Sequence, residues 1–90
     1  MNRRRVVYQG RVQGVGFRAR AKHASVGQAI TGWVRNEPDG TVTLEAQGEP
    51  DAIDAYLDLL RRRVSGLVER ELTFETGLLR GESGFEITHA

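Results

Sequence analysis

Residues 30–47 read ITGWVRNEPDGTVTLEAQ, two short strand-like runs joined by a turn signal. Residues 30–35 contain β-branched and aromatic side chains, and residues 41–47 alternate polar and apolar side chains, as a half-buried strand does. The Pro-Asp-Gly sequence at positions 38–40 favours a tight turn. We therefore expect an antiparallel hairpin with one apolar face.

A helix is predicted on each side of this hairpin. Apolar residues at i, i+4 and i+7 from Phe17 indicate a first helix that ends at about Ser25 or Val26. Pro50 suits the first position of a second helix. The apolar stripe of that second helix consists of Ile53, Leu57, Leu60 and Val64.

The two ends of the chain supply the remaining strands. A valine-rich run predicts a strand over residues 5–12, alternation predicts another over residues 71–75, and Phe85 and Ile87 mark a short last strand. The order is βαββαβ with one extra short strand. Elements that each have a single apolar face fit an α+β sandwich of two layers, with both helices on one face of an antiparallel sheet.

Length and composition fit one folded domain. A chain of 90 residues has room for one core, so residues 1–90 are expected to form a single domain. No apolar run approaches the roughly 20 residues that span a bilayer. The apolar stretch after the basic start is too short for a signal peptide, and there is no cysteine. We therefore expect a cytoplasmic protein without disulfides or thiolate metal sites.

The charges are distributed unevenly along the sequence. No Asp or Glu precedes Glu37, so the first 36 residues carry +8. Because the net charge is +1, residues 37–90 must carry −7. Folding can either interleave the two halves or leave a positive face that attracts an anionic ligand.

A glycine-rich loop joins the first predicted strand to the first helix. Residues 10–18 read GRVQGVGFR. Glycines allow main-chain N–H groups to converge, and free N–H groups at a helix N-terminus attract phosphate. Arg18, in the first turn of the helix, is able to add two parallel donors to phosphate oxygens. The alternative is a plain tight turn with Arg18 on the surface, and the residues alone leave both open.

The same loop matches the dinucleotide fingerprint G-x-G-x-x-A at Gly14, Gly16 and Ala19. A dinucleotide-binding fold needs a further crossover helix where this sequence has a tight hairpin, and it needs a larger parallel sheet than this chain can form. We therefore do not expect a dinucleotide cofactor.

Four segments, in order, resemble the acylphosphatase family. They are GRVQGVGFR (residues 10–18), GWVRN (residues 32–36), DGTV (residues 39–42) and AQG (residues 46–48). The resemblance covers about the first half of the chain. The order of helices and strands in the second half agrees with the ferredoxin-like sandwich of that family.

The resemblance implies hydrolysis of the carboxyl-phosphate bond of acyl phosphates to a carboxylate and inorganic phosphate. Water attacks directly, with no covalent intermediate, metal or cofactor. By the family motif, Arg18 binds the phosphate together with main-chain N–H groups, and Asn36 orients the attacking water. The implied substrate-binding residues are Gln13, Gly14, Val15, Gly16, Phe17 and Arg18.

This reaction can be catalysed by few side chains, such as Arg18 and Asn36. A carboxylate leaving group has a pKa near 4, so it needs no general acid, and phosphoryl transfer depends mainly on positioning and charge stabilisation. We expect a monomer that binds a small acyl phosphate, with inorganic phosphate as product and competitor. We expect neither nucleic acid nor a membrane as a partner.

Two positions depart from the family pattern. Glu37 stands where some relatives have Thr, and residues 64–68 lack the Gly-Pro pair that often follows the second helix. Glu37 puts an anion near an anionic substrate. However, neighbouring strand residues face opposite sides of a sheet, so the carboxylate is able to point away.

Two other functions are compatible with the same order of elements. An RNA-recognition sandwich needs exposed aromatic residues on its central strands, whereas the outward positions of residues 41–47 are Thr, Thr, Glu and Gln. A non-catalytic acylphosphatase-like domain, as found in hydrogenase-maturation carbamoyltransferases, is disfavoured because both Arg18 and Asn36 are present. His23 and His89 are far apart in the sequence, so neither a metal site nor a Ser-His pair is expected.

Overall fold

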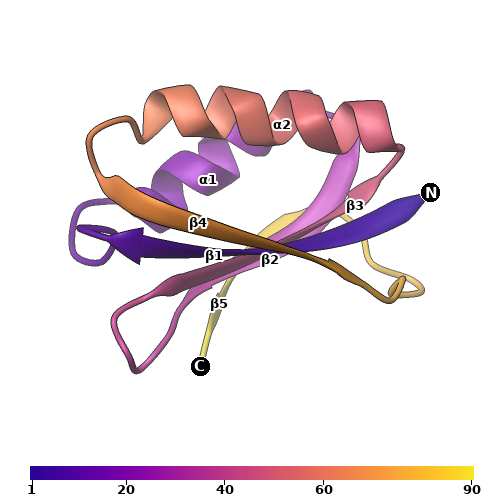
Figure 1. Ribbon diagram of the computed structural model, residues 1–90. Coiled ribbons are helices and arrows are strands. Elements are labelled where there is room, and N and C mark those ends of the chain that lie inside the picture. Colours follow the sequence, from indigo (N-terminus) through magenta and orange to yellow (C-terminus); the bar gives the residue numbers. More distant parts are fainter.

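The computed structural model describes residues 1–90, and all of its strands belong to one five-stranded sheet. Both helices lie on the same face of this sheet (Figure 1). Neither helix has the length and apolar composition that crossing a membrane requires. In chain order the elements are β1 (Asn2–Gly10), α1 (Phe17–Ser25), β2 (Ile30–Asn36), β3 (Val42–Gly48), α2 (Pro50–Arg63), β4 (Val68–Thr76) and β5 (Phe85–His89).

The predicted α+β sandwich is confirmed, with one correction to the sheet. The strand order is β4-β1-β3-β2-β5, and the first three neighbouring pairs are antiparallel. β5 instead runs parallel to β2, so the sheet is mixed and not wholly antiparallel as predicted. The cause is the chain reversal between β4 and β5. Because β4 and β2 point in opposite directions, a strand that reverses after β4 must run with β2.

The ends of the helices and strands are predicted best where they depend on neighbouring residues. The first helix and the hairpin strands lie within one residue of their predicted ends. β1 begins at Asn2 rather than at residue 5, because Arg3 and Arg4 pair with β3 and β4 although they add no apolar alternation to the sequence. β4 is likewise longer than the predicted residues 71–75.

The apolar core lies between the helices and the sheet. Val42, Leu44 and Ala46 of β3 are fully buried, as the alternation predicted. Tyr56 of α2 lies outside the predicted stripe, yet it is also fully buried, and its hydroxyl donates to the main-chain oxygen of Ala21 at 2.8 Å. This bond satisfies the buried hydroxyl and joins α2 to α1.

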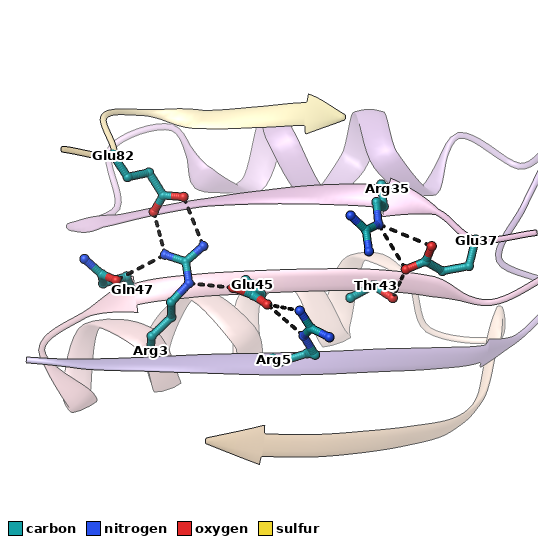
Figure 2. A network of polar contacts seen from close by, with 8 residues as sticks. All are labelled: Arg3, Arg5, Arg35, Glu37, Thr43, Glu45, Gln47 and Glu82. Atoms are coloured by element: carbon teal, nitrogen blue, oxygen red, sulfur yellow. Dashed lines mark hydrogen bonds and ion pairs between the residues drawn. The ribbon is translucent and has the colours of Figure 1, made fainter. Parts of the chain in front are cut away.

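The face opposite the helices carries a network of ion pairs (Figure 2). Arg3 and Arg5 of β1 both bind Glu45 of β3. Arg3 also donates to both carboxylate oxygens of Glu82, at 2.8 and 3.0 Å. Arg3 is only 2% exposed, and although burial opposes ionisation, its hydrogen bonds to the carboxylates of Glu82 and Glu45 leave the pKa of Arg3 raised. For these N-terminal arginines, folding interleaves the two oppositely charged halves of the sequence.

The connection between β4 and β5, residues 77–84, is bound to the rest of the molecule through this network. Glu82 anchors it to Arg3, and the side-chain amide of Gln47 both donates to the main-chain oxygen of Leu79 at 3.0 Å and accepts from its N–H at 2.8 Å. These contacts fix the connection that leads to β5, and β5 in turn forms one wall of the pocket described next.

Candidate active site

A pocket of about 260 Å³ lies where the β1–α1 loop (residues 11–16), the end of β2 and the end of β5 meet. Arg18 and Asn36, the two predicted catalytic residues, both line it. Of the other predicted phosphate-binding residues, Gly14, Gly16 and Phe17 line the pocket. Segments distant in sequence thus bring the main predicted groups together.

Gly14 and Gly16 give the β1–α1 loop its shape. Their φ angles are +73° and +78°, in the left-handed region that other L-residues rarely adopt. A Cβ atom at either position would meet no neighbouring atom within 4 Å. Backbone conformation, rather than lack of space, therefore requires glycine at both positions.

The main-chain N–H groups of residues 12–19 are free. None of them donates to a main-chain or side-chain acceptor of the protein, and the next N–H group, that of Arg20, bonds to the Gly16 oxygen at 3.0 Å. The last of these free groups belong to the first turn of α1, where the helix dipole is positive. This run of donors is suited to an anion.

Three of the predicted substrate-binding side chains hold the loop in place. The Gln13 amide donates to the main-chain oxygens of Glu37 and Thr41, at 2.8 and 2.9 Å. Val15 packs against the core, and Phe17 is buried with its ring centroid 4.9 Å from that of Tyr8. These three side chains contact other protein atoms. The groups of the same residues that remain for a ligand are therefore the main-chain N–H groups.

Arg18 has no carboxylate within 4.0 Å, unlike the arginines of β1. The neighbour of its guanidinium is His89, whose Nδ1 lies 3.4 Å from Arg18 Nη1. Sequence reasoning missed His89 as a pocket residue. It reaches the site because β5 pairs parallel to β2 with His89 opposite Asn36, and no local signal in the sequence reveals that register.

Asn36 is the last residue of β2, and its side-chain oxygen Oδ1 is buried without a hydrogen-bond partner. A buried polar atom left unpaired typically costs about 1–3 kcal/mol, so such atoms are rare unless a ligand or water satisfies them. The oxygen is an acceptor beside a run of donors. It therefore keeps an unused capacity to accept one hydrogen bond.

Glu37 points away from the pocket, on the open face of the sheet (Figure 2). Its carboxylate accepts from the Thr43 hydroxyl at 2.6 Å and from Arg35 Nε at 3.1 and 3.2 Å. The Thr43 hydrogen bond, followed by Arg35, lowers the pKa of Glu37 against the opposing effect of burial. This departure from the family pattern therefore places no carboxylate in the pocket.

The pocket is positively charged and lacks carboxylates. Its lining includes Arg18 and His89 but no Asp or Glu. No cluster of three or more His, Asp or Glu side chains in the chain is arranged to hold a metal ion. The groups that the pocket offers are hydrogen-bond donors for an anion and the single unpaired acceptor of Asn36.

Comparison with known proteins identifies the family of the chain. The family model described as Acylphosphatase matches residues 4–87. The chain is 43% identical over 84 residues to an acylphosphatase of Oceanobacillus iheyensis, covering 87% of this chain and 92% of that protein. It is 48% identical over 60 residues to an acylphosphatase of Geobacillus thermodenitrificans, covering 67% of this chain and 64% of that protein.

A solved structure shows the same likeness in three dimensions. The crystal structure of acylphosphatase from Bacillus subtilis matches with a TM-score of 0.86 at 30% sequence identity, over 98% of this chain and 99% of that one. Sequence and fold therefore agree over nearly the whole length. The chain belongs to the acylphosphatase family, the hydrolases that cleave acyl phosphates.

Proposed function

We propose that this pocket hydrolyses acyl phosphates by direct attack of water on the phosphoryl group, without a covalent intermediate. The free N–H groups of residues 12–19 and Arg18 hold the phosphoryl oxygens, and Asn36 orients the water. The observation that carries the proposal is the buried, unpartnered Oδ1 of Asn36 in the same pocket as those donors.

The bond changes require little of the protein. The water oxygen bonds to phosphorus as the bond between phosphorus and the acyl oxygen breaks, and the carboxylate leaves with the electron pair. A proton of the water passes to a phosphoryl oxygen of the substrate. The carboxylate needs no general acid, so the main contributions are charge stabilisation and orientation. A well-placed donor typically contributes about 3–4 kcal/mol to such a transition state.

Binding follows from the same contacts. Inorganic phosphate should compete with substrate, because the donors recognise phosphoryl oxygens rather than the acyl part. Affinity should weaken with salt, because Arg18 is partly exposed and its charge is screened. The monomeric state and the cytoplasmic location stay predictions from the sequence.

The test is hydrolysis of benzoyl phosphate by the wild type and by Asn36→Ala. We expect the wild type to be active with or without EDTA, and Asn36→Ala to lose about 100-fold in kcat with KM and phosphate affinity nearly unchanged. Asn2→Ala, the other asparagine of the chain, is the matched control. Thermal unfolding of each variant separates chemistry from stability.

Two results would contradict the proposal. Asn36→Ala could keep near-wild-type kcat, or lose activity only in proportion to unfolding, and the asparagine would then have no role in orienting water. A wild type that binds phosphate but does not hydrolyse benzoyl phosphate would identify the chain as a non-catalytic member of the family.

A further inference from the structure

The β1–α1 loop and Asn36 come from different parts of the chain, and one side chain connects them by hydrogen bonds. Gln13 Nε2 lies 2.8 Å from the main-chain oxygen of Glu37 and 2.9 Å from that of Thr41. Both partners are carbonyl oxygens, which only accept. The amide nitrogen must therefore face them, and both of its N–H groups are used.

The two carbonyls belong to a well-fixed turn. The Glu37 N–H donates to the Thr41 oxygen at 2.9 Å, and the Gly40 N–H donates to the Glu37 oxygen at 3.1 Å. The Glu37 side chain is bound on the far face of the sheet by Thr43 and Arg35. Gln13 therefore binds a turn that is held independently, and this turn directly follows Asn36.

No other hydrogen bond joins the loop to the β2–β3 turn. The main-chain bonds of the loop run elsewhere: the Arg11 N–H donates to the oxygen of Leu67, at the other side of β1, and the Gly16 oxygen accepts from the Arg20 N–H of α1. Without Gln13, the separation between the loop N–H groups and Asn36 would depend on packing and on the pairing of β1 and β2 with β3, which reaches only as far as Tyr8 on the loop side. Reactions of this kind are sensitive to such a change, since a displacement of about 1 Å can cost about 100-fold in rate.

We propose that Gln13 is a positioning residue that sets the distance between the phosphate-binding loop and the water-orienting Asn36. Its side chain does not contact substrate, although its main-chain N–H remains free for the phosphoryl group. The proposal rests on the proposed function, because it assumes that Asn36 acts on a water molecule. It deepens that function by assigning a residue that makes the two halves of the site act together.

The experiment is a double-mutant cycle between Gln13→Met and Asn36→Ala, measured by benzoyl phosphate hydrolysis. Methionine keeps the length of the side chain but has no N–H donor. We expect Gln13→Met to lose about 10- to 100-fold in kcat in the wild-type background. Phosphate affinity should change less than about twofold, because Arg18 and the loop N–H groups remain. In the Asn36→Ala background the same change should cost less than about twofold in kcat, since no water is then oriented.

A matched control and a second variant complete the test. Gln28→Met, in the connection between α1 and β2, also replaces a glutamine amide but lies outside the pocket, and should leave kcat unchanged. Gln13→Glu keeps the shape and again lacks the N–H donors. Its kcat should fall at least as far as that of Gln13→Met. If the methionine variant is poorly folded, Gln13→Glu replaces it in the double-mutant cycle.

The outcomes separate this proposal from the proposed function. If Asn36→Ala is impaired while folded Gln13 variants keep their kcat, the positioning role is wrong and the proposed function stands. Equal losses in both backgrounds, or a parallel loss of phosphate affinity, would also overturn it, because Gln13 would then act on stability or on the loop alone. If Asn36→Ala keeps its kcat, both proposals fall together.

Discussion

Arg18 and His89 are 71 residues apart in sequence, yet the guanidinium Nη1 of one lies 3.4 Å from Nδ1 of the other. The contact places the end of β5 against the first turn of α1. Because Arg18 has no carboxylate partner, the imidazole is the one side chain that accepts from it. An unprotonated imidazole nitrogen can accept a hydrogen bond from the guanidinium without neutralising the positive charge of Arg18. The charge of Arg18 therefore stays available to an anion.

Replacing His89 should weaken phosphate binding modestly. In His89→Ala the guanidinium loses an acceptor that restricts its orientation, and we expect KM and the inhibition constant of phosphate to rise about three- to tenfold, in line with one exposed hydrogen bond. Steady-state kinetics with phosphate as inhibitor measures both. His23→Ala is the control, because His23 contacts Arg63 on the helix surface instead. An equal effect of the two substitutions would show that the Arg18 contact is unimportant.

Arg18 itself should affect both binding and turnover. In the proposed mechanism it contacts the phosphoryl group in the ground state and in the transition state, so Arg18→Ala should raise KM and also lower kcat by about 100- to 1,000-fold. Arg18→Lys should not restore activity, because a point charge cannot replace two parallel donors. Arg20→Ala, also on α1 but outside the pocket, should behave as the wild type. Full activity of the lysine variant would refute the paired-donor contact.

The Glu37 carboxylate should make stability depend on acid pH. Its pKa in the folded state is below the ordinary value, first because of the Thr43 hydroxyl and then because of Arg35. The ionised group therefore stabilises the fold above the ordinary carboxyl pKa of about 4.3, and this contribution is lost as the pH falls through the lower folded-state pKa. Thermal unfolding from pH 7 to pH 2 should show Glu37→Gln less stable than the wild type at pH 7 and equally stable at the acid end.

Two variants control that experiment. Thr43→Val removes the largest cause of the shift, so the acid-dependent loss should be smaller than in the wild type and should be complete at a higher pH. Glu69→Gln removes an exposed carboxylate that has no cation within 4.0 Å, and so controls for the loss of one negative charge. A difference for Glu37→Gln that is constant from pH 7 to pH 2 would contradict the assignment.

Arg3 should be among the most sensitive positions for stability. Arg3→Met leaves Glu45 without one of its two arginines and Glu82 without its only arginine, all in a largely buried setting. Breaking a buried pair in this way typically costs about 3–5 kcal/mol, which urea unfolding would measure. The control is Arg80→Met. Arg80 lies in the β4–β5 connection, as Glu82 does, but it forms no ion pair. A loss below about 1 kcal/mol would instead fit an ordinary surface pair.

Local patterns predicted the hairpin and both helices, because those signals depend on neighbouring residues. Arg18, Asn36 and the loop were identified by their resemblance to the family, and the structure places them in one pocket. His89 and the parallel pairing of β5 could not be predicted, since they depend on a register between distant strands. The bonds of Gln13 across 24 and 28 residues were missed for the same reason. The sequence around Gln13 does not indicate which distant main-chain oxygens its side-chain amide will bind.

The position of β1 inside the sheet, between β4 and β3, determines when, during folding, the proposed active site can form. Val6 of β1 lies between Leu44 of β3 and Thr73 of β4, so both of its neighbours come from far along the chain. The β2–β3 hairpin can form locally. The pairing of β1 with β3 and β4 instead closes long loops, and the entropy of loop closure is lost before the strand contacts form. Folding should therefore take milliseconds to seconds rather than the microseconds typical of small helical proteins. On the ribosome, we therefore expect the β1–α1 loop to be made early but to adopt its final shape only after β3 and β4 have emerged.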